Sequence, residues 1–512
     1  MSGYRGRNGW NLMPQPFLRF QQVVFGYDTA IEPLFKDISV HISTGWTGIV
    51  GSNGAGKTTF LKLATGLLSP DAGVVIGPER TVYCPQRTDT LPEHFAELLQ
   101  DSSKKASLIK EQSGVKGDWL NRWTTLSHGE RKRAQVAVAF WLEPDVLAID
   151  EPTNHIDAEA RDILIQALCT FKGVGLFVSH DRELLDSLCM QCAFIQPPDV
   201  IVRPGGYSKG ASLAADEDLT LRRKYEVRKK AFKKLRCEAG RRRDLANHSR
   251  LSKRGIAKHD HDEKAKIDGA RVAGKDAIGG KLLKQLDGRI AHLQDELESI
   301  RVTKQYSLGI WLPGSISRRD VLLNLPPLTV PLGAQKKLMC PQLVLRSTDR
   351  LALTGPNGGG KSTLLRQLLP QLNAPPQQVT YVPQEIDAQQ CRDILSQAQN
   401  LPHEQLGYLM TIVSRLGSRP HRLLESMEPS PGEARKLLLA LGMTHKPHII
   451  IMDEPTNHMD LPSIECLEAA LADCPCCLLL VSHDRSFLNK LTETEWRISH
   501  KAASEGFSLH IL

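Results

Sequence analysis

Short apolar runs alternate with helical stretches over two long parts of the chain. Three of these runs, Thr47 to Val50, Val146 to Ile149 and Leu176 to Val178, consist almost entirely of apolar or small residues. Strands of a parallel sheet show this pattern because helices cover both faces. We therefore predict α/β units in which the segments after these strands gather at one edge of a mostly parallel sheet.

A different pattern separates the two α/β parts. Apolar residues recur at alternating spacings of three and four, which predicts a helix with a heptad seam; they are Leu283, Leu286, Ile290, Leu293, Leu297 and Ile300. A weaker apolar stripe on a preceding helix consists of Leu221, Tyr225, Phe232 and Leu235. The two helices are expected to pair as an antiparallel hairpin with its tip from about Asn247 to Gly280.

Five short sequence words occur twice in the same order, which indicates a duplicated domain. They are two Gly-rich loops ending at Lys57 and Lys361, Tyr-x-Pro before Gln86 and Gln384, Ser-x-Gly-Glu at Ser127 and Ser430, Asp-Glu-Pro-Thr-Asn-His around Glu151 and Glu454, and Val-Ser-His-Asp-Arg around His180 and His483. We predict an N-terminal extension over residues 1–16, a first domain over 17–212, a helical linker over 213–305 and a second domain over 306–512.

The linker is strongly basic. Between Leu221 and Ile290 there are 23 Lys and Arg against 9 Asp and Glu, a net charge of +14, whereas the whole chain carries +8. The rest of the chain is therefore net acidic. A concentrated basic helix fits a nucleic-acid phosphate backbone, although a charged run is also compatible with a simple solvated surface. The candidate RNA contacts are Arg241, Arg242, Arg243, Lys253 and Arg254.

Composition places the chain among globular proteins. It has 512 residues, 41% of them hydrophobic and 24% charged, and contains no apolar run long enough to span a bilayer. The segment from Met1 to Phe20 lacks the apolar core of a secretory signal. The eleven cysteines are scattered, so we expect reduced core thiols, Cys189 and Cys192 included, rather than zinc ligands. These features predict a cytoplasmic protein.

Both Gly-rich loops have the spacing of a phosphate-binding loop. Glycines let successive backbone N–H groups converge on phosphates at a helix N-terminus, while the lysine reaches the β- and γ-phosphates. The predicted ATP contacts are Gly51, Ser52, Asn53, Gly54, Ala55, Gly56, Lys57, Thr58 and Thr59 in the first domain, and Gly355, Pro356, Asn357, Gly358, Gly359, Gly360, Lys361, Ser362 and Thr363 in the second.

The carboxylates that follow two apolar strands are the candidate catalytic groups. Asp150 and Asp453 stand where a metal-holding aspartate belongs, and the next residues, Glu151 and Glu454, can polarise a water that attacks the γ-phosphate. His180 and His483 are expected to hold that phosphate and the water in line. The predicted Mg²⁺ site comprises Thr58, Gln86 and Asp150 in one domain and Ser362, Gln384 and Asp453 in the other.

These residues resemble the ATP-binding cassette superfamily. The word Leu126-Ser127-His128-Gly129-Glu130 resembles the family signature, and the resemblance makes Ser127, Gly129, Glu130, Ser430, Gly432 and Glu433 the signature residues. It implies two cassettes that close head to tail within one monomeric chain. Lys57 then shares its ATP with the signature at Ser430, and Lys361 with the signature at Ser127. Asp157 and Asp460 match the D-loop aspartates of the family.

More narrowly, the chain resembles the F subfamily. The resemblance rests on two cassettes in one chain, the Glu-Pro-Thr-Asn-His-x-Asp form after the aspartate, and a basic helical linker. It implies binding to the ribosome near the tRNA exit site, with the linker directed at rRNA and the peptidyl-site tRNA. The implied role is assistance to translation or protection against ribosome-targeting antibiotics.

The chain also departs from that pattern. Gln86 and Ser127 are only 41 residues apart, too close for the helical arm that many members insert there. Tyr27 is placed to stack on adenine, whereas the equivalent position of the second copy is Pro331. The second signature reads Pro429-Ser430-Pro431-Gly432-Glu433, so the two ATP sites are expected to differ.

Two other functions fit an ATPase of this kind. The ATPase subunit of a membrane transporter would have an ample helical subdomain and no basic linker. A DNA-repair or chromosome ATPase would have zinc-binding cysteine pairs or very long coiled coils. The sequence favours neither alternative.

Overall fold

The computed structural model describes residues 16–28, 31–153, 156, 158–254, 275–299, 314–333, 336–416, 418, 431–457, 459–500 and 506–512. By contacts the chain divides into two compact units: one comprises residues 1–210 and 306–512, and the other residues 211–305. The larger unit contains both predicted cassettes. Among the described residues, no helix combines the length and apolarity needed to cross a membrane.

The first cassette contains two sheets. Its six-stranded sheet has the order β5-β6-β7-β3-β8-β9 and is parallel except for the β8–β9 pair. The strands are β3 (Gly45–Gly51), β5 (Thr81–Cys84), β6 (Val146–Asp150), β7 (Val174–Val178), β8 (Cys189–Gln196) and β9 (Asp199–Pro204). An antiparallel sheet of order β2-β1-β4 is formed by β1 (Leu18–Phe25), β2 (Phe35–Ile42) and β4 (Ala72–Ile76).

Continuous burial explains the central strands. Every residue of β6 and of β7 is buried, as the two apolar runs predicted, because helices and neighbouring strands cover both faces. The helices of this cassette are α1 (Lys57–Ala64), α2 (Phe95–Gln100), α3 (Lys104–Gln112), α4 (His128–Trp141), α5 (Ala158–Cys169) and α6 (Arg182–Leu188). Only α2, α3 and two 3₁₀ turns lie between Gln86 and Ser127, so no long arm is inserted there.

The second cassette repeats this plan with one larger sheet. Its order is β11-β12-β19-β18-β14-β17-β16-β15, and the four central pairs that include β14, β16 and β17 are parallel. The strands are β11 (Leu328–Pro331), β12 (Lys337–Cys340), β14 (Arg350–Thr354), β15 (Val379–Val382), β16 (Ile449–Asp453), β17 (Cys477–Val481), β18 (Thr494–His500) and β19 (Phe507–Ile511); β10 (Val321–Leu325) pairs separately with β13 (Leu343–Arg346).

Helices of the second cassette follow the same succession. They are α10 (Lys361–Leu368), α11 (Ala388–Gln399), α12 (His403–Arg415), α14 (Pro431–Thr444), α15 (Leu461–Ala472) and α16 (Arg485–Leu491). Aliphatic side chains from α11, α12 and α14, among them Leu409 and Leu437, form one core with side chains of strand β16. The predicted α/β class and mostly parallel sheets are therefore confirmed in both copies.

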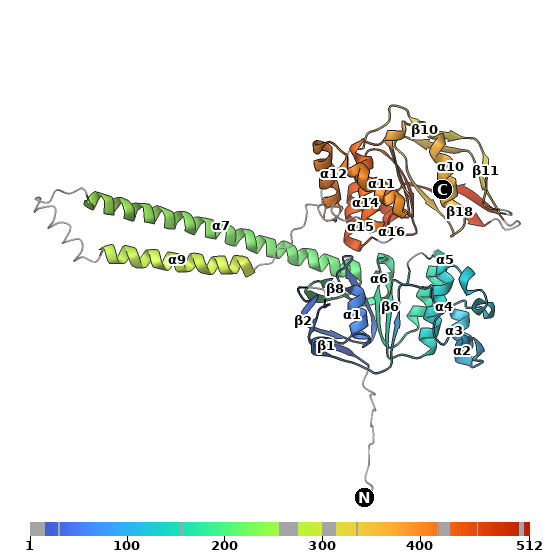
Figure 1. The fold of residues 1–512 in the computed structure, drawn as a ribbon, viewed down its shortest axis with the longest axis horizontal. Coiled ribbons are helices and arrows are strands. Elements are labelled where there is room, and N and C mark those ends of the chain that lie inside the picture. The colour runs from blue at the N-terminus through green and yellow to red at the C-terminus, as the bar shows by residue number, and fades with distance from the viewer. Residues whose placement is uncertain are drawn as a thin grey trace, which may run out of the picture. The chain divides into compact units, whose positions relative to one another are not determined.

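Two long helices form the body of the smaller unit. Helix α7 (Tyr207–Arg254) begins in the larger unit, and α9 (Lys275–Ser299) runs alongside it (Figure 1). Arg228 pairs with Glu296 and Arg243 with Asp287, so rising numbers on α7 meet falling numbers on α9 and the helices are antiparallel. Leu286 of the predicted heptad seam is buried. Most of the predicted tip, residues 255–274, and the side chains of Leu283 and Ile300 of the seam lie outside what the structure describes.

Candidate functional site

The phosphate-binding loop of the first cassette joins the end of β3 to the start of α1. Gly54 and Gly56 adopt positive φ angles of 77° and 95°, which a side chain would disfavour, and Gly56 caps the helix. Lys57 folds back over the loop and donates to the carbonyl oxygens of Gly51 and Ser52 at 2.9 and 3.2 Å. The loop is thus shaped to receive an anion at the helix N-terminus.

Two acidic residues, Asp150 and Glu151, stand at the end of β6, opposite that loop. The Thr58 hydroxyl donates to Asp150 Oδ2 at 2.7 Å, which brings the two predicted metal ligands together. Glu151 has a positive φ of 49°, unusual for a side chain of its size, and its N–H donates to the Val178 carbonyl. His180 Nε2 lies 2.8 Å from Glu151 Oε1. The structure therefore places the predicted catalytic glutamate and histidine in direct contact.

A cavity of about 500 Å³ opens above this loop. Tyr27 lines it with an exposed fraction of 49%, and its hydroxyl lies 2.8 Å from that of Thr59. The ring is therefore tethered beside the loop with much of its surface available for stacking. Gln86 also lines the cavity, together with Glu32 and Leu34, which the sequence motifs did not single out.

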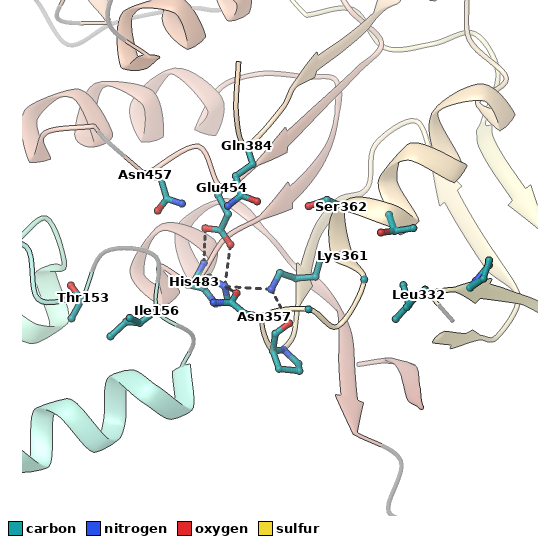
Figure 2. Close-up of a pocket in the computed structure, with 16 residues that line it drawn as sticks. Thr153, Ile156, Leu332, Asn357, Lys361, Ser362, Gln384, Glu454, Asn457 and His483 are labelled. Carbon is teal, nitrogen blue, oxygen red and sulfur yellow. Dashed lines mark hydrogen bonds and ion pairs between the residues drawn. The ribbon is translucent and has the colours of Figure 1, made fainter. Parts of the chain in front are cut away.

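Lys361 organises the second loop in the same way (Figure 2). Its ammonium donates to the Gly355 and Pro356 carbonyls at 2.8 and 3.2 Å and lies 3.3 Å from His483 Nε2. His483 Nε2 also lies 3.1 Å from the Asn357 side-chain oxygen. Lysine, histidine and loop thus converge on one point in this cassette, where a terminal phosphate belongs.

Glu454 occupies the same strained position as Glu151. Its φ is 50°, its carboxylate is reached by the His483 backbone N–H and ring, each at 3.3 Å, and burial raises its pKa to about 8. Lys361 opposes that rise by its positive charge. A second buried carboxyl, Asp453, also has a raised pKa because of burial. A positive charge placed beside either carboxyl would therefore favour its ionised form.

The aspartates fit a divalent cation. Both carboxylate oxygens of Asp453 are buried, and neither accepts a well-formed hydrogen bond within the described residues. The Ser362 hydroxyl nevertheless lies near enough to oppose the rise in the pKa of Asp453. Buried anionic oxygens short of donors, beside a hydroxyl, are the ligands that Mg²⁺ prefers.

The same groups recur in the first cassette. Burial raises the pKa of Asp150, which the Thr58 hydroxyl opposes. Asp150 with Thr58, and Asp453 with Ser362, would hold the ion. Gln86 and Gln384 line the two cavities, and their predicted contact with the ion stays a prediction.

The second cavity has a volume of about 600 Å³ and a different lining where the adenine is predicted to stack. Pro331, Leu332 and Gly333 line it where Tyr27 lines the first, so the expected lack of an aromatic side chain at this position holds for the lining residues. Thr153 and Ile156, which belong to the first cassette, also line this cavity (Figure 2). The site on Lys361 is therefore bordered by residues of both cassettes.

Signature residues begin a helix in each copy. Ser127 caps α4: its hydroxyl accepts from the Glu130 N–H, and the Glu130 carboxylate accepts from the Ser127 N–H. Gly432 and Glu433 lie in the first turn of α14, whereas Ser430 lies outside the described residues. Asp460 accepts from the Asn53 backbone N–H at 2.8 Å, a contact between the two cassettes. Its counterpart Asp157 is not described.

The predicted RNA contacts fall on α7, away from both cavities in sequence. Arg242 pairs with Glu238 and Arg243 with Asp287, while Arg241 is exposed. Lys253 and Arg254 belong to the last turn of the helix, and their side chains are outside the described part. The helix thus presents basic groups, two of which are partly neutralised.

Comparisons with known proteins agree with this geometry. A family model described as ABC transporter matches residues 35–154 and 341–457, once in each cassette. The chain is 29% identical over 497 residues to the ribosome protection protein VmlR of Bacillus subtilis, covering 93% of this chain and 85% of that protein. It is 27% identical to the tylosin resistance ATP-binding protein TlrC of Streptomyces fradiae, covering 94% and 96%.

Solved structures show the same fold. The structure named RNase-L Inhibitor superposes with a TM-score of 0.59 at 18% identity, covering 96% of this chain and 90% of that one. At this identity the similarity concerns the fold alone and carries no further assignment.

Proposed function

We propose that the chain is a member of the F subfamily of the ATP-binding cassette proteins and an ATP-driven clamp that acts on the ribosome. The chain is an ATPase with two cassettes. The observation that supports two working sites most directly is the repeated pair of a strained glutamate and a histidine, Glu151 with His180 and Glu454 with His483, each opposite a phosphate-binding loop.

Each loop binds the phosphates of one ATP. The backbone N–H groups of the loop and the helix N-terminus attract the anionic oxygens, and ATP draws the lysine ammonium from the carbonyls that now accept from it. Burial lowers the pKa of Lys57, but three carboxylates around it favour the charged form. The lysine therefore meets the β- and γ-phosphates as a cation.

Hydrolysis depends on the glutamates. Glu151 and Glu454 accept a proton from the water that attacks the γ-phosphate, which makes the oxygen more nucleophilic. His180 and His483 donate to the γ-phosphate and hold the water in line. When bound, Mg²⁺ neutralises charge on the phosphate oxygens, and Asp150 with Thr58 and Asp453 with Ser362 keep it beside the loop.

The ribosome is the partner that best fits the smaller unit. The relative VmlR is named a ribosome protection protein, and TlrC a tylosin resistance protein. Helix α7 of this chain carries the concentrated basic residues, which suit the phosphates of rRNA and peptidyl-site tRNA. A ribosomal partner implies a cytoplasmic location. The clamp either assists translation or protects it from antibiotics, and drug susceptibility of cells with and without the protein separates the two.

Co-sedimentation with ribosomes tests this function. The variant with Glu151→Gln and Glu454→Gln should bind ATP without hydrolysing it, remain closed and sediment with ribosomes in ATP but not in ADP. The matched control carries Lys57→Ala and Lys361→Ala, which remove phosphate binding, and should stay in the supernatant in either nucleotide. A double glutamine variant that never sediments with ribosomes would contradict the ribosomal function.

A further inference from the structure

One face of the signature helix α4 is polar and points at the segment that contains Gln86. His128, Lys132 and Gln135 are spaced by four and three residues, so they share one side of the helix. Each contacts a residue of the stretch 85–88, which follows β5 directly. Gln86 itself lines the ATP cavity of the first cassette.

Lys132 makes the central contact. Its side chain is 1% exposed, and its ammonium donates to the Pro85 carbonyl at 2.8 Å and to the Asp150 carbonyl at 2.9 Å. One group therefore ties the residue before Gln86 to the residue before Glu151. Burial lowers its pKa to about 8. A buried ammonium is costly unless its hydrogens are accepted, so the two carbonyls and Lys132 hold one another in place.

Two further contacts fix the other side of Gln86. The Thr88 hydroxyl lies 3.0 Å from His128 Nδ1, and Thr88 is buried. Gln135 Nε2 donates to the Arg87 carbonyl at 3.5 Å, a long hydrogen bond. The backbone is therefore restrained immediately before and immediately after Gln86 by a single helix.

The second cassette lacks this arrangement. A shift of 303 residues, the offset between Ser127 and Ser430, gives Pro431, Arg435 and Leu438 as the counterparts. Proline and leucine have no polar side-chain atom. Arg435 hydrogen-bonds instead to the Asn457 carbonyl at 2.7 Å, in the segment that follows Glu454. Burial lowers the pKa of Arg435, and the charge of Glu385, the residue after Gln384, opposes this shift without a hydrogen bond.

We infer that Lys132, with His128 and Gln135, positions Gln86 in the ATP site built on Lys57. The inference rests on the proposed function, in which the signature at Ser127 completes the other site, built on Lys361. Helix α4 then transmits the state of the Lys361 site to Gln86, because Ser127 caps the same helix. Within the described residues, no hydrogen bond from Arg435 or Leu438 reaches the backbone around Gln384. The hydrogen-bonded path between the two sites is therefore present in one cassette only.

Single-turnover ATP hydrolysis in a Glu454→Gln background tests the inference, because only the Lys57 site then hydrolyses ATP. Lys132→Met keeps the aliphatic stem and removes the donors; it should slow hydrolysis about tenfold, the effect of one hydrogen bond to a charged group. The dissociation constant for ATP should not change, since the loop and Lys57 are intact. A slower rate with an unchanged dissociation constant separates a positioning role of Lys132 from a general loss of the ATP site.

A double-mutant cycle with Gln86→Ala identifies the path. If Lys132 acts through Gln86, the combined variant is no slower than Gln86→Ala alone. Multiplied losses, or a Lys132→Met variant with an unchanged rate, would overturn the inference. The matched cycle of Arg435→Met with Gln384→Ala, measured in a Glu151→Gln background, should give multiplied losses, because Arg435 hydrogen-bonds to Asn457 and not to the backbone around Gln384. Non-additive losses in both cassettes would contradict a path confined to the first cassette.

Two controls keep the result interpretable. Thermal melting shows whether Lys132→Met folds; if it does not, Thr88→Val, which removes only the hydroxyl beside His128, replaces it in the same cycle with the same expected outcome. Hydrolysis by the Glu151→Gln, Glu454→Gln double variant with Lys132 intact is measured alongside. Activity in that double variant would refute the proposed catalytic residues. Multiplied losses in the Lys132 cycle would refute only the inference about Lys132.

Discussion

At the scale of single residues, the raised pKa of Glu454 predicts a pH-dependent stability of the nucleotide-free protein. The folded-state pKa, about 8, exceeds the usual value of 4.5, so ionisation is disfavoured in the folded state. The protonated form therefore contributes stability below pH 4.5 that is lost as the pH rises through about 8. Glu454→Gln mimics that form, and its melting temperature relative to wild type should rise between about pH 4.5 and pH 8 and level off above that range. Parallel melting curves across this range would contradict the buried, uncharged state.

Pro431 predicts unequal hydrolysis at the two sites. It stands where the first copy has His128. In the proposed head-to-tail arrangement, the signature that serves Lys57 then lacks one backbone N–H and with it a hydrogen bond to the γ-phosphate, worth about 1.5–3 kcal/mol. In the same arrangement the Lys361 site is served by the signature at Ser127 and should turn over faster by about ten- to a hundredfold. In single-turnover assays Glu454→Gln should thus lose more activity than Glu151→Gln. Equal losses, or a larger loss for Glu151→Gln, would refute this asymmetry.

The motifs located the proposed functional groups but not the contacts that hold them. The positions of the loops, the aspartates and the glutamate–histidine pairs could be predicted because each lies at the end of an apolar strand at a recognisable spacing. Nothing local indicated that Glu151 and Glu454 have positive φ angles, or that Lys132 reaches two carbonyls. Such features depend on how the backbones of distant segments are placed, and no local pattern encodes them.

At the scale of elements, the basic helix α7 predicts salt-dependent ribosome binding. Neutral replacement of the five candidate contacts, Arg241, Arg242, Arg243, Lys253 and Arg254, should weaken binding and flatten its dependence on salt. Each lost phosphate contact removes roughly 0.7 to 0.9 from the slope of log affinity against log salt. Arg242 and Arg243 already pair with carboxylates. The total change in slope should therefore be smaller than the change expected from losing five full phosphate contacts.

A salt titration of ribosome affinity measures this slope. The matched control neutralises Lys104 and Lys116, exposed lysines of the first cassette, and should leave the slope unchanged. ATP hydrolysis without ribosomes should be the same in all variants. An unaltered slope for the α7 variant would mean that the basic residues of α7 serve only solubility.

Periodicity predicted the central strands and the paired helices, but not the antiparallel sheets at the edges. The apolar runs correspond to the buried strands β3, β6 and β7, and the heptad spacing corresponds to α9 with Leu286 buried. The antiparallel sheets at the edge of each cassette were not predicted, because their strands alternate buried and exposed residues with bulges, as in β1 and its partners. Register shifts of this kind disrupt the regular period on which sequence patterns rely.

At the scale of the larger unit, contacts between the cassettes lie beyond any sequence motif. Arg182 and Glu468, 286 positions apart, form a buried ion pair with one bond of 3.1 Å, and Lys490 also reaches Glu468. The Tyr207 hydroxyl, at the start of α7, donates to Glu465, one helical turn before Glu468. The counterpart of Glu468 at the 303-residue offset is Ile165, which carries no charge, so this ion pair has no equivalent by symmetry.

Removing Glu468 should destabilise the unit strongly. Glu468→Ala leaves the Arg182 guanidinium buried without its partner, which typically costs about 3–5 kcal/mol. Denaturant unfolding should show a lower midpoint for this variant. The control is Gln166→Ala at an exposed position of α5, the matching helix of the first cassette, and it should unfold near the wild-type midpoint. Equal midpoints for the two variants would show that the ion pair contributes nothing to stability.

Steady-state ATP hydrolysis by the variant with both Glu151→Gln and Glu454→Gln, measured together with its ATP affinity, tests the central claim most directly. The two carboxylates are assigned the attacking water, while the loops and lysines that bind phosphate are untouched. The account predicts that hydrolysis falls by about a hundredfold or more while ATP binding is retained. Hydrolysis near the wild-type rate, or loss of ATP binding together with activity, would contradict it.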